Sequence, residues 1–195
     1  MNSLKNIILL FFLISYNQIS FSQEKVSYKD FIQKKENLIL NKDYVTFKID
    51  TLSNSDFLNK VTIINFWFES CAPCIAEMEG LNKLYEKNKN NKNFQFISFC
   101  TDNLETINKN LKKYTIEYSV TAIEKGKAYE LNYNSGFPST FIINSEGKVI
   151  YFSLGGPVEV KKATEKGMSI YDQKINEELI KSRQPKAVSR NYFPR

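Results

Sequence analysis

Two cysteines separated by two residues, Cys71 and Cys74, are the side chains of this sequence best suited to chemistry. They follow an apolar run typical of a buried strand and precede a stretch typical of a helix. At the start of a helix, unpaired backbone N–H groups and the helix dipole stabilise a thiolate. Pro73 fits the first turn because the N–H that proline lacks would be unpaired there. We therefore expect a redox-active disulfide, with Cys71 as the exposed nucleophile and Cys74, one turn deeper, as the resolving thiol.

Three other uses of a Cys-x-x-Cys pair compete with this one. A zinc site would need two further ligands, but the 195 residues contain no histidine and only one other cysteine, Cys100. Haem attachment would need a histidine after Cys74, where the sequence has Ile75. A disulfide with a purely structural role stays open. We predict no metal or other cofactor.

The composition excludes several classes of function. Without histidine, neither Ser-His-Asp nor Cys-His catalysis can operate. Hydrophobic residues make up 42% of the chain and aromatic residues 14%, which is enough for a core, and the length suits one domain. The formal net charge is +6 without a concentrated basic patch, so we interpret the charge as a solvated surface and expect no nucleic-acid partner.

Residues 1–22 have the layout of a secretory signal peptide. Lys5 supplies the positive charge, residues 7–14 form an apolar run of eight, and Ser20 and Ser22 occupy the −3 and −1 positions of a cleavage site. A helix of eight residues rises about 12 Å, too little for a hydrocarbon core of about 30 Å. We expect a cleaved signal and export to the periplasm, with an uncleaved membrane anchor as the alternative.

The remaining chain divides into a predicted domain, residues 23–180, and a basic tail, residues 181–195. The tail contains five basic and no acidic residues, and we expect it to be mobile, with a binding arm as the alternative.

Apolar patterns in the domain predict strands that alternate with helices. Strands are expected at residues 44–49, 61–68, 94–99, 139–143 and 148–154. Helices are expected at residues 24–40, from 71–73 through Leu81, Leu84 and Tyr85 to a polar stretch, at 103–114 and at 158–182. Residues 144–147, Asn-Ser-Glu-Gly, predict the turn of a hairpin. The order is that of an α/β fold: a central mixed sheet flanked by helices, with an N-terminal β extension.

Two segments resemble a known family. Residues 65–79, NFWFESCAPCIAEME, resemble the active-site segment of the thioredoxin superfamily, especially the exported TlpA/ResA-type thiol-disulfide oxidoreductases. Residues 136–151, GFPSTFIINSEGKVIY, resemble the family's cis-proline strand and the hairpin after it. The resemblance implies a thioredoxin fold, a cis peptide bond before Pro138, and a backbone at Phe137 that pairs with the substrate chain.

The resemblance also assigns roles near the cysteines. It places Ala72, Pro73 and Trp67 beside the substrate, with Trp67 first of all a packing residue. Asn65 stands where cytoplasmic thioredoxins have a buried aspartate, and its neutral amide cannot accept a proton from Cys74. Glu77 stands where ResA-type members have a glutamate. There it would raise the pKa values of the thiols and take the proton of the resolving cysteine, unless it is only a solvated carboxylate favoured by the helix dipole.

The sequence departs from the family pattern in two places beside the motif. Ser70 replaces the usual tryptophan, and Phe68 replaces a common alanine, so the substrate preference of the family cannot be carried over. Phe68 also excludes a peroxiredoxin, which needs threonine there. We expect Cys100 to be a buried free thiol, with a role as a third redox cysteine as the alternative.

The resemblance implies a protein disulfide reductase. No histidine lies between the cysteines, and a nearby carboxylate opposes a thiolate, so we expect a reducing pair. The expected partners are disulfides of exported proteins, among them apocytochrome c before haem attachment, and a membrane thiol-electron transporter as reductant. The alternative function is a binding module of the same fold whose disulfide is structural.

Overall fold

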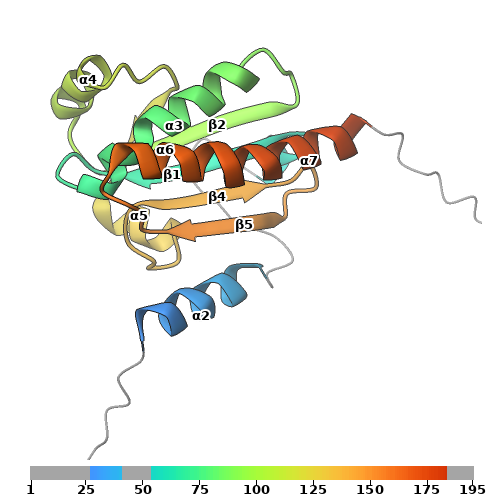
Figure 1. The fold of residues 1–195 in the computed structure, drawn as a ribbon, viewed down its shortest axis with the longest axis horizontal. Helices are drawn as coiled ribbons and strands as arrows, with labels where there is room; N and C mark the ends of the chain where they lie inside the picture. Colours follow the sequence, from blue (N-terminus) through green and yellow to red (C-terminus); the bar gives the residue numbers. More distant parts are fainter. Residues whose placement is uncertain (1–26, 41–53, 184–195) are drawn as a thin grey trace, which may run out of the picture. The chain divides into compact units, whose positions relative to one another are not determined.

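The computed structural model describes residues 27–40 and 54–183 (Figure 1). The chain divides into two units, residues 1–31 and 32–195, and the sheet and the helices that cover it belong to the second. No helix within the described ranges is long and apolar enough to cross a membrane.

Five strands form one sheet, and helices lie between and after them. The strands are β1 (Val61–Trp67), β2 (Phe94–Cys100), β3 (Val120–Ala122), β4 (Ser139–Ile143) and β5 (Val149–Leu154). The helical segments are α2 (Tyr28–Leu40), η1 (Asn54–Phe57), α3 (Ala72–Asn88), α4 (Leu104–Lys113), α5 (Lys125–Leu131), α6 (Val160–Lys166), the π-helical turn η2 (Gly167–Tyr171) and α7 (Asp172–Arg183).

The strand order is β3-β2-β1-β4-β5. β1 pairs in parallel with β2, and β2 with β3, whereas β4 is antiparallel to both β1 and β5. This arrangement confirms the predicted central mixed sheet. The pairing of Trp67 with Cys100, and of Phe66 with Ser139, brings the end of β1, the end of β2 and the start of β4 to one edge of the sheet.

Both faces of the sheet are covered, which explains why β1 is buried along its whole length. On one face, Ile63 and Ile142 pack against Leu81 of α3 and Ile175 of α7. On the other face, Ile64, Phe66 and Phe141 pack with Ala128 and Leu131 of α5. Alternate residues of a strand point to opposite faces, so Asn65 and Thr140 point to the α3 side, as Ile63 and Ile142 do.

Several expectations need correction. Neither β3 nor α5 was expected, and the final helix is interrupted by the turn η2. Leu104, expected on the apolar face of its helix, is 65% exposed because it is the first residue of α4. The helix α7 runs to Arg183, three residues into the segment assigned to the tail. The expected strand at 44–49, which is the N-terminal extension, the signal at 1–22 and the rest of the tail lie outside the described residues.

Candidate active site

Cys71 and Cys74 form a disulfide at the beginning of α3, with their Cα atoms 5.2 Å apart. The loop between β1 and α3 is short, so the pair lies at the edge of the sheet where β1 ends. Cys71 is the N-cap of the helix, and its carbonyl accepts the backbone N–H of Ile75 at 3.0 Å. The strand therefore positions the disulfide, and the helix places its positive end behind Cys71.

The N-cap position gives a reduced Cys71 a defined hydrogen-bond donor. An N-cap side chain accepts from the N–H of the second or third helical residue. The second helical residue is Pro73, which has no N–H, so the available donor is the backbone N–H of Cys74. In the disulfide form Cys71 makes no such hydrogen bond. Reduction of the disulfide would free the Cys71 sulfur to accept a hydrogen bond from the backbone N–H of Cys74. That hydrogen bond would stabilise the Cys71 thiolate.

Cys71 is less exposed than the sequence suggested. Cys71 is 6% exposed and Cys74 is 1% exposed. Cys74 is therefore the more deeply buried of the two, as expected, but the nucleophile Cys71 is also largely shielded from solvent. Phe68 and Phe137 pack against the cluster of buried side chains that contains both cysteines, and their ring centroids lie 5.4 Å apart in an edge-to-face contact. Tyr129 packs on Phe137 in the same way at 5.3 Å. Sequence reasoning overlooked this aromatic cover because its rings come from three separate segments.

The peptide bond between Phe137 and Pro138 is cis, as the resemblance implied. Pro138 is buried, and its carbonyl accepts the N–H of Gly155 at 2.8 Å. The pairing of Phe66 with Ser139 places Pro138 at the level of the end of β1, so the cis-proline and the disulfide share one edge of the sheet. Phe137 is partly buried at this edge.

The other residues assigned to substrate binding lie at different depths. Ala72 is exposed and Pro73 is partly buried, so both contribute to the surface beside the disulfide. Trp67 is 1% exposed, and its indole Nε1 donates to Ser98 Oγ at 2.9 Å. Trp67 belongs to the same buried cluster as Cys71, Cys74 and Cys100. The structure therefore shows the packing role of Trp67.

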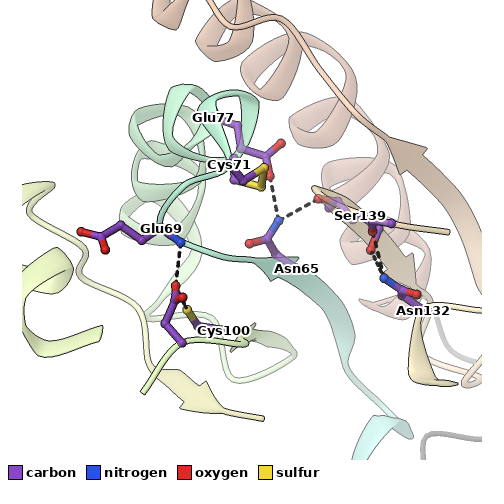
Figure 2. The surroundings of a disulfide bond; sticks show 11 residues. Asn65, Glu69, Cys71, Glu77, Cys100, Asn132 and Ser139 are labelled. Carbon is purple, nitrogen blue, oxygen red and sulfur yellow. Dashed lines mark hydrogen bonds between the residues drawn. A yellow bond between two sulfur atoms is a disulfide. The ribbon is translucent and has the colours of Figure 1, made fainter. Parts of the chain in front are cut away.

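Glu77 is buried beneath the disulfide rather than solvated at the helix surface. It follows Cys74 by three residues on α3, so the two side chains share one face of the helix. Its side chain is drawn with the disulfide in Figure 2, and its residue is 7% exposed. Asn65 Nδ2 donates to Glu77 Oε1 at 2.8 Å and to Thr140 Oγ1 at 3.0 Å. The amide of Asn65 thus fixes the carboxyl group in place without being able to take a proton itself.

The environment of Glu77 makes it a group that titrates near neutrality. Burial raises its pKa from the ordinary 4.5 to about 7, against the opposing effects of the Asn65 hydrogen bond and of the charge on Lys166. A carboxyl group with a pKa near the working pH can both accept and release a proton in each cycle. The sequence pointed to Glu77, but it gave no sign of Thr140 or Lys166.

Cys100 is a buried free thiol, as expected. Its Sγ lies 3.3 Å from Asp102 Oδ2, and the same oxygen accepts the backbone N–H of Glu69 at 2.6 Å (Figure 2). Burial is the main reason why the pKa of Cys100 rises to about 12, and the negative charge of Asp102 adds to it. Cys100 is therefore a neutral thiol at physiological pH, and Asp102 ties the loop before Cys71 to the end of β2.

Within the described ranges, no cluster of three or more His, Cys, Asp or Glu side chains could hold a metal ion. Among the described residues, this edge of the sheet brings together the disulfide, the buried carboxyl group of Glu77 with its hydrogen bonds, and the neutral thiol of Cys100. Such a set can exchange disulfides and move one proton.

Comparison with known proteins agrees with this chemistry. The sequence profile of the Redoxin family matches residues 43–166. The thiol-disulfide oxidoreductase ResA of Bacillus cereus is 32% identical over 76% of this chain and 85% of its own length. ResA of Bacillus thuringiensis subsp. konkukian is 32% identical over 63% of this chain and 74% of its own length.

Solved structures show the same fold. A candidate protein disulfide isomerase from Bacteroides thetaiotaomicron superposes with a TM-score of 0.56 at 23% identity, covering 66% of this chain and 79% of its own. A candidate thiol:disulfide interchange protein DsbE from Chlorobium tepidum gives 0.52 at 23% identity, covering 67% and 85%. From its disulfide, its fold and these relatives, the chain belongs to the Redoxin family and is a thiol-disulfide oxidoreductase similar to ResA.

Proposed function

We propose that the protein reduces disulfides of exported proteins by dithiol exchange through Cys71 and Cys74. The observation that supports this direction most strongly is the buried Glu77, whose pKa is raised to about 7 beside the pair. Once ionised, this carboxylate opposes the formation of thiolates on the same helix face. The Glu77 carboxylate thereby offsets part of the thiolate stabilisation that the helix start provides, and a less stabilised reduced form makes the pair a stronger reductant, since strong oxidants of this kind owe their potential to a stabilised reduced form.

The exchange has two steps. The Cys71 thiolate attacks one sulfur of the substrate disulfide, forms a mixed disulfide and releases one substrate thiolate. Cys74 then gives its proton to Glu77 and attacks Cys71 Sγ, which closes the Cys71–Cys74 disulfide and releases the second substrate thiolate. Two electrons pass from the cysteine pair to the substrate. A dithiol donor must reduce the pair again, and for that role we propose a membrane thiol-electron transporter.

The aromatic cover shapes how a substrate would bind. Phe68 and Phe137 pack against the cluster that contains Cys71, while Ser70 and Ala72 are its exposed neighbours in the chain. A substrate disulfide would have to reach Cys71 over this rim and pair with the backbone before Pro138. Apocytochrome c is the client that the resemblance implies, and the proposed location is the periplasm, after removal of residues 1–22.

Reduction of insulin in the presence of dithiothreitol tests the proposed function. The protein without residues 1–22 should accelerate the precipitation of insulin chains, and a Cys71→Ser variant should not. A Cys100→Ala variant is the matched control, because its thiol is buried and neutral. Equal rates with and without the protein would instead indicate a binding module with a structural disulfide.

A further inference from the structure

A partly buried lysine lies at the end of α6, the helix that packs against α3 beside Gly80. Lys166 is the last residue of α6, and its Nζ donates to Ser153 Oγ at 2.7 Å and to the carbonyl of Gly155 at 3.4 Å. Both acceptors are neutral. The ammonium is thus held in a fixed place by the end of β5, and no carboxylate of the described residues forms an ion pair with it.

A close crossing of two helical segments brings this lysine toward Glu77. Gly80 follows Glu77 by three residues on the same face of α3. A Cβ at Gly80 would lie 3.1 Å from the Cα of Thr164 in α6, and a Cβ at Gly167 would lie 3.8 Å from the Cα of Gly80. The two glycines let the backbones approach at Gly80, three residues after Glu77 on α3, and at Gly167, which directly follows Lys166 in the chain. The π-helical turn η2 begins directly after this lysine.

The charges of Lys166 and Glu77 act on each other across this crossing. The positive charge of Lys166 lowers the pKa of Glu77, and the negative charge of Glu77 raises the pKa of Lys166, while burial has the larger and opposite effect on each. Each ion therefore makes the other less costly to bury.

The remaining groups around Glu77 are neutral at physiological pH. Burial raises the pKa of Tyr118 and of Tyr171, and both hydroxyls stay protonated. Asn65 and Thr140 face Glu77 from the sheet and do not titrate. Among the described residues, Lys166 is the cation that acts on Glu77, and the two cysteine thiols are the other ionisable groups near it once the disulfide is reduced.

We propose that Lys166 is a positioning residue for the resolving half of the exchange: its ammonium keeps Glu77 ionised and so able to take the proton of Cys74. The inference rests on the proposed function and assigns a task to a residue outside the disulfide motif. In the step itself, the S–H bond of Cys74 breaks, its proton goes to Glu77, and the sulfur attacks Cys71 Sγ while the substrate thiolate leaves. Lys166 exchanges no proton or electron. It acts through the charge state of Glu77.

The test measures Glu77 directly in the oxidised protein, by the pH titration of its side-chain carboxyl carbon in NMR spectra. Lys166→Met removes the charge and should raise the pKa of Glu77 by about 1, the lower end of the effect of an opposite charge nearby. Lys166→Arg should leave it close to the wild-type value of about 7. Lys162→Met is the matched control, because Lys162 lies on the same helix, pairs with Glu159 and is exposed. It should cause no change.

The functional half of the test is the pH profile of the exchange rate. Lys166→Met should shift the rising limb of this profile to higher pH by as many pH units as the pKa of Glu77 rises in the NMR titration. Lys166→Arg should keep the wild-type profile. An equal pKa of Glu77 in Lys166→Met and Lys162→Met would overturn the inference, and so would a shifted titration without a shifted pH profile. If Lys166→Met does not fold, Lys166→Gln, which can still donate to Ser153, takes its place.

The two proposals can fail separately. The NMR titration uses the oxidised protein and needs no turnover, so a wild-type protein that does not reduce insulin would contradict the proposed function whatever the titration shows. A protein that reduces insulin with the same pH profile in all three lysine variants would contradict only the role of Lys166.

Discussion

Replacing Glu77 with glutamine should change how the stability of the oxidised protein depends on pH. The pKa of Glu77 is about 7 in the folded protein and 4.5 for the ordinary carboxyl group, which represents the unfolded chain. Between these values the folded protein holds a proton that the unfolded chain has released. The free energy of unfolding therefore falls as pH rises from 4.5 through about 7, and no further above that.

The size of this loss follows from the two values. Proton linkage for one group gives a decrease of about 2.5 kcal/mol between pH 5 and pH 8. Glu77→Gln has no proton to lose, so its free energy of unfolding should exceed that of the wild type by about 2.5 kcal/mol more at pH 8 than at pH 5. The chain has no histidine, and the disulfide keeps Cys71 and Cys74 from titrating, so little else changes in this range.

Urea unfolding of both proteins at pH 5, 6, 7 and 8 measures this difference. Glu79→Gln is the matched control, because Glu79 lies two residues further along the same helix, is exposed and pairs with Lys83. The difference in the free energy of unfolding between Glu79→Gln and the wild type should stay constant with pH. A constant difference for Glu77→Gln as well would refute the reasoning, since it would mean that Glu77 is ionised at pH 5 like a solvated carboxyl group.

Two further predictions concern the thiol and the helix crossing. Cys100 should not react with a thiol reagent at pH 7 in the native oxidised protein, but should react as one thiol after denaturation; rapid native labelling would contradict its burial. Gly80→Ala should lower the free energy of unfolding by about 1 kcal/mol, since overpacking against Thr164 outweighs the gain in helix propensity. Gly126→Ala, in open space on α5, should raise it by about 0.5 kcal/mol, and equal effects of both would argue against the close crossing.

Much of the fold could be predicted because the covered sheet leaves a strong local signal. The strand β1 is buried on both faces, so its sequence is almost continuously apolar, and the residues between β4 and β5 have the composition of a hairpin turn. The strand β3 has only three residues, and its extended conformation is stabilised by pairing with β2 rather than by a local sequence pattern. A segment this short carries no readable period.

The candidate site was predictable only where the chemistry is local. The cysteine pair and its place at a helix start could be inferred from spacing. Glu77 is buried among elements that are far apart in sequence, with Asn65 of β1 on its carboxyl group and α6 packed on α3 at the nearby Gly80, and a glutamate by itself gives no sign of this burial. The low exposure of Cys71 likewise involves residues far from it in sequence, among them Phe137, which packs against the same buried cluster. Such properties arise from tertiary packing, which a single sequence does not display.

The reduction potential of the Cys71–Cys74 pair, measured by equilibration with glutathione or dithiothreitol buffers, tests the central claim most directly. The buried carboxyl group beside the pair and the absence of histidine between the cysteines predict a potential well below about −200 mV, toward that of thioredoxin. A potential near the roughly −120 mV of strong oxidants would contradict the account, because it would mean that the helix start stabilises the thiolate strongly and that Glu77 does not offset this effect.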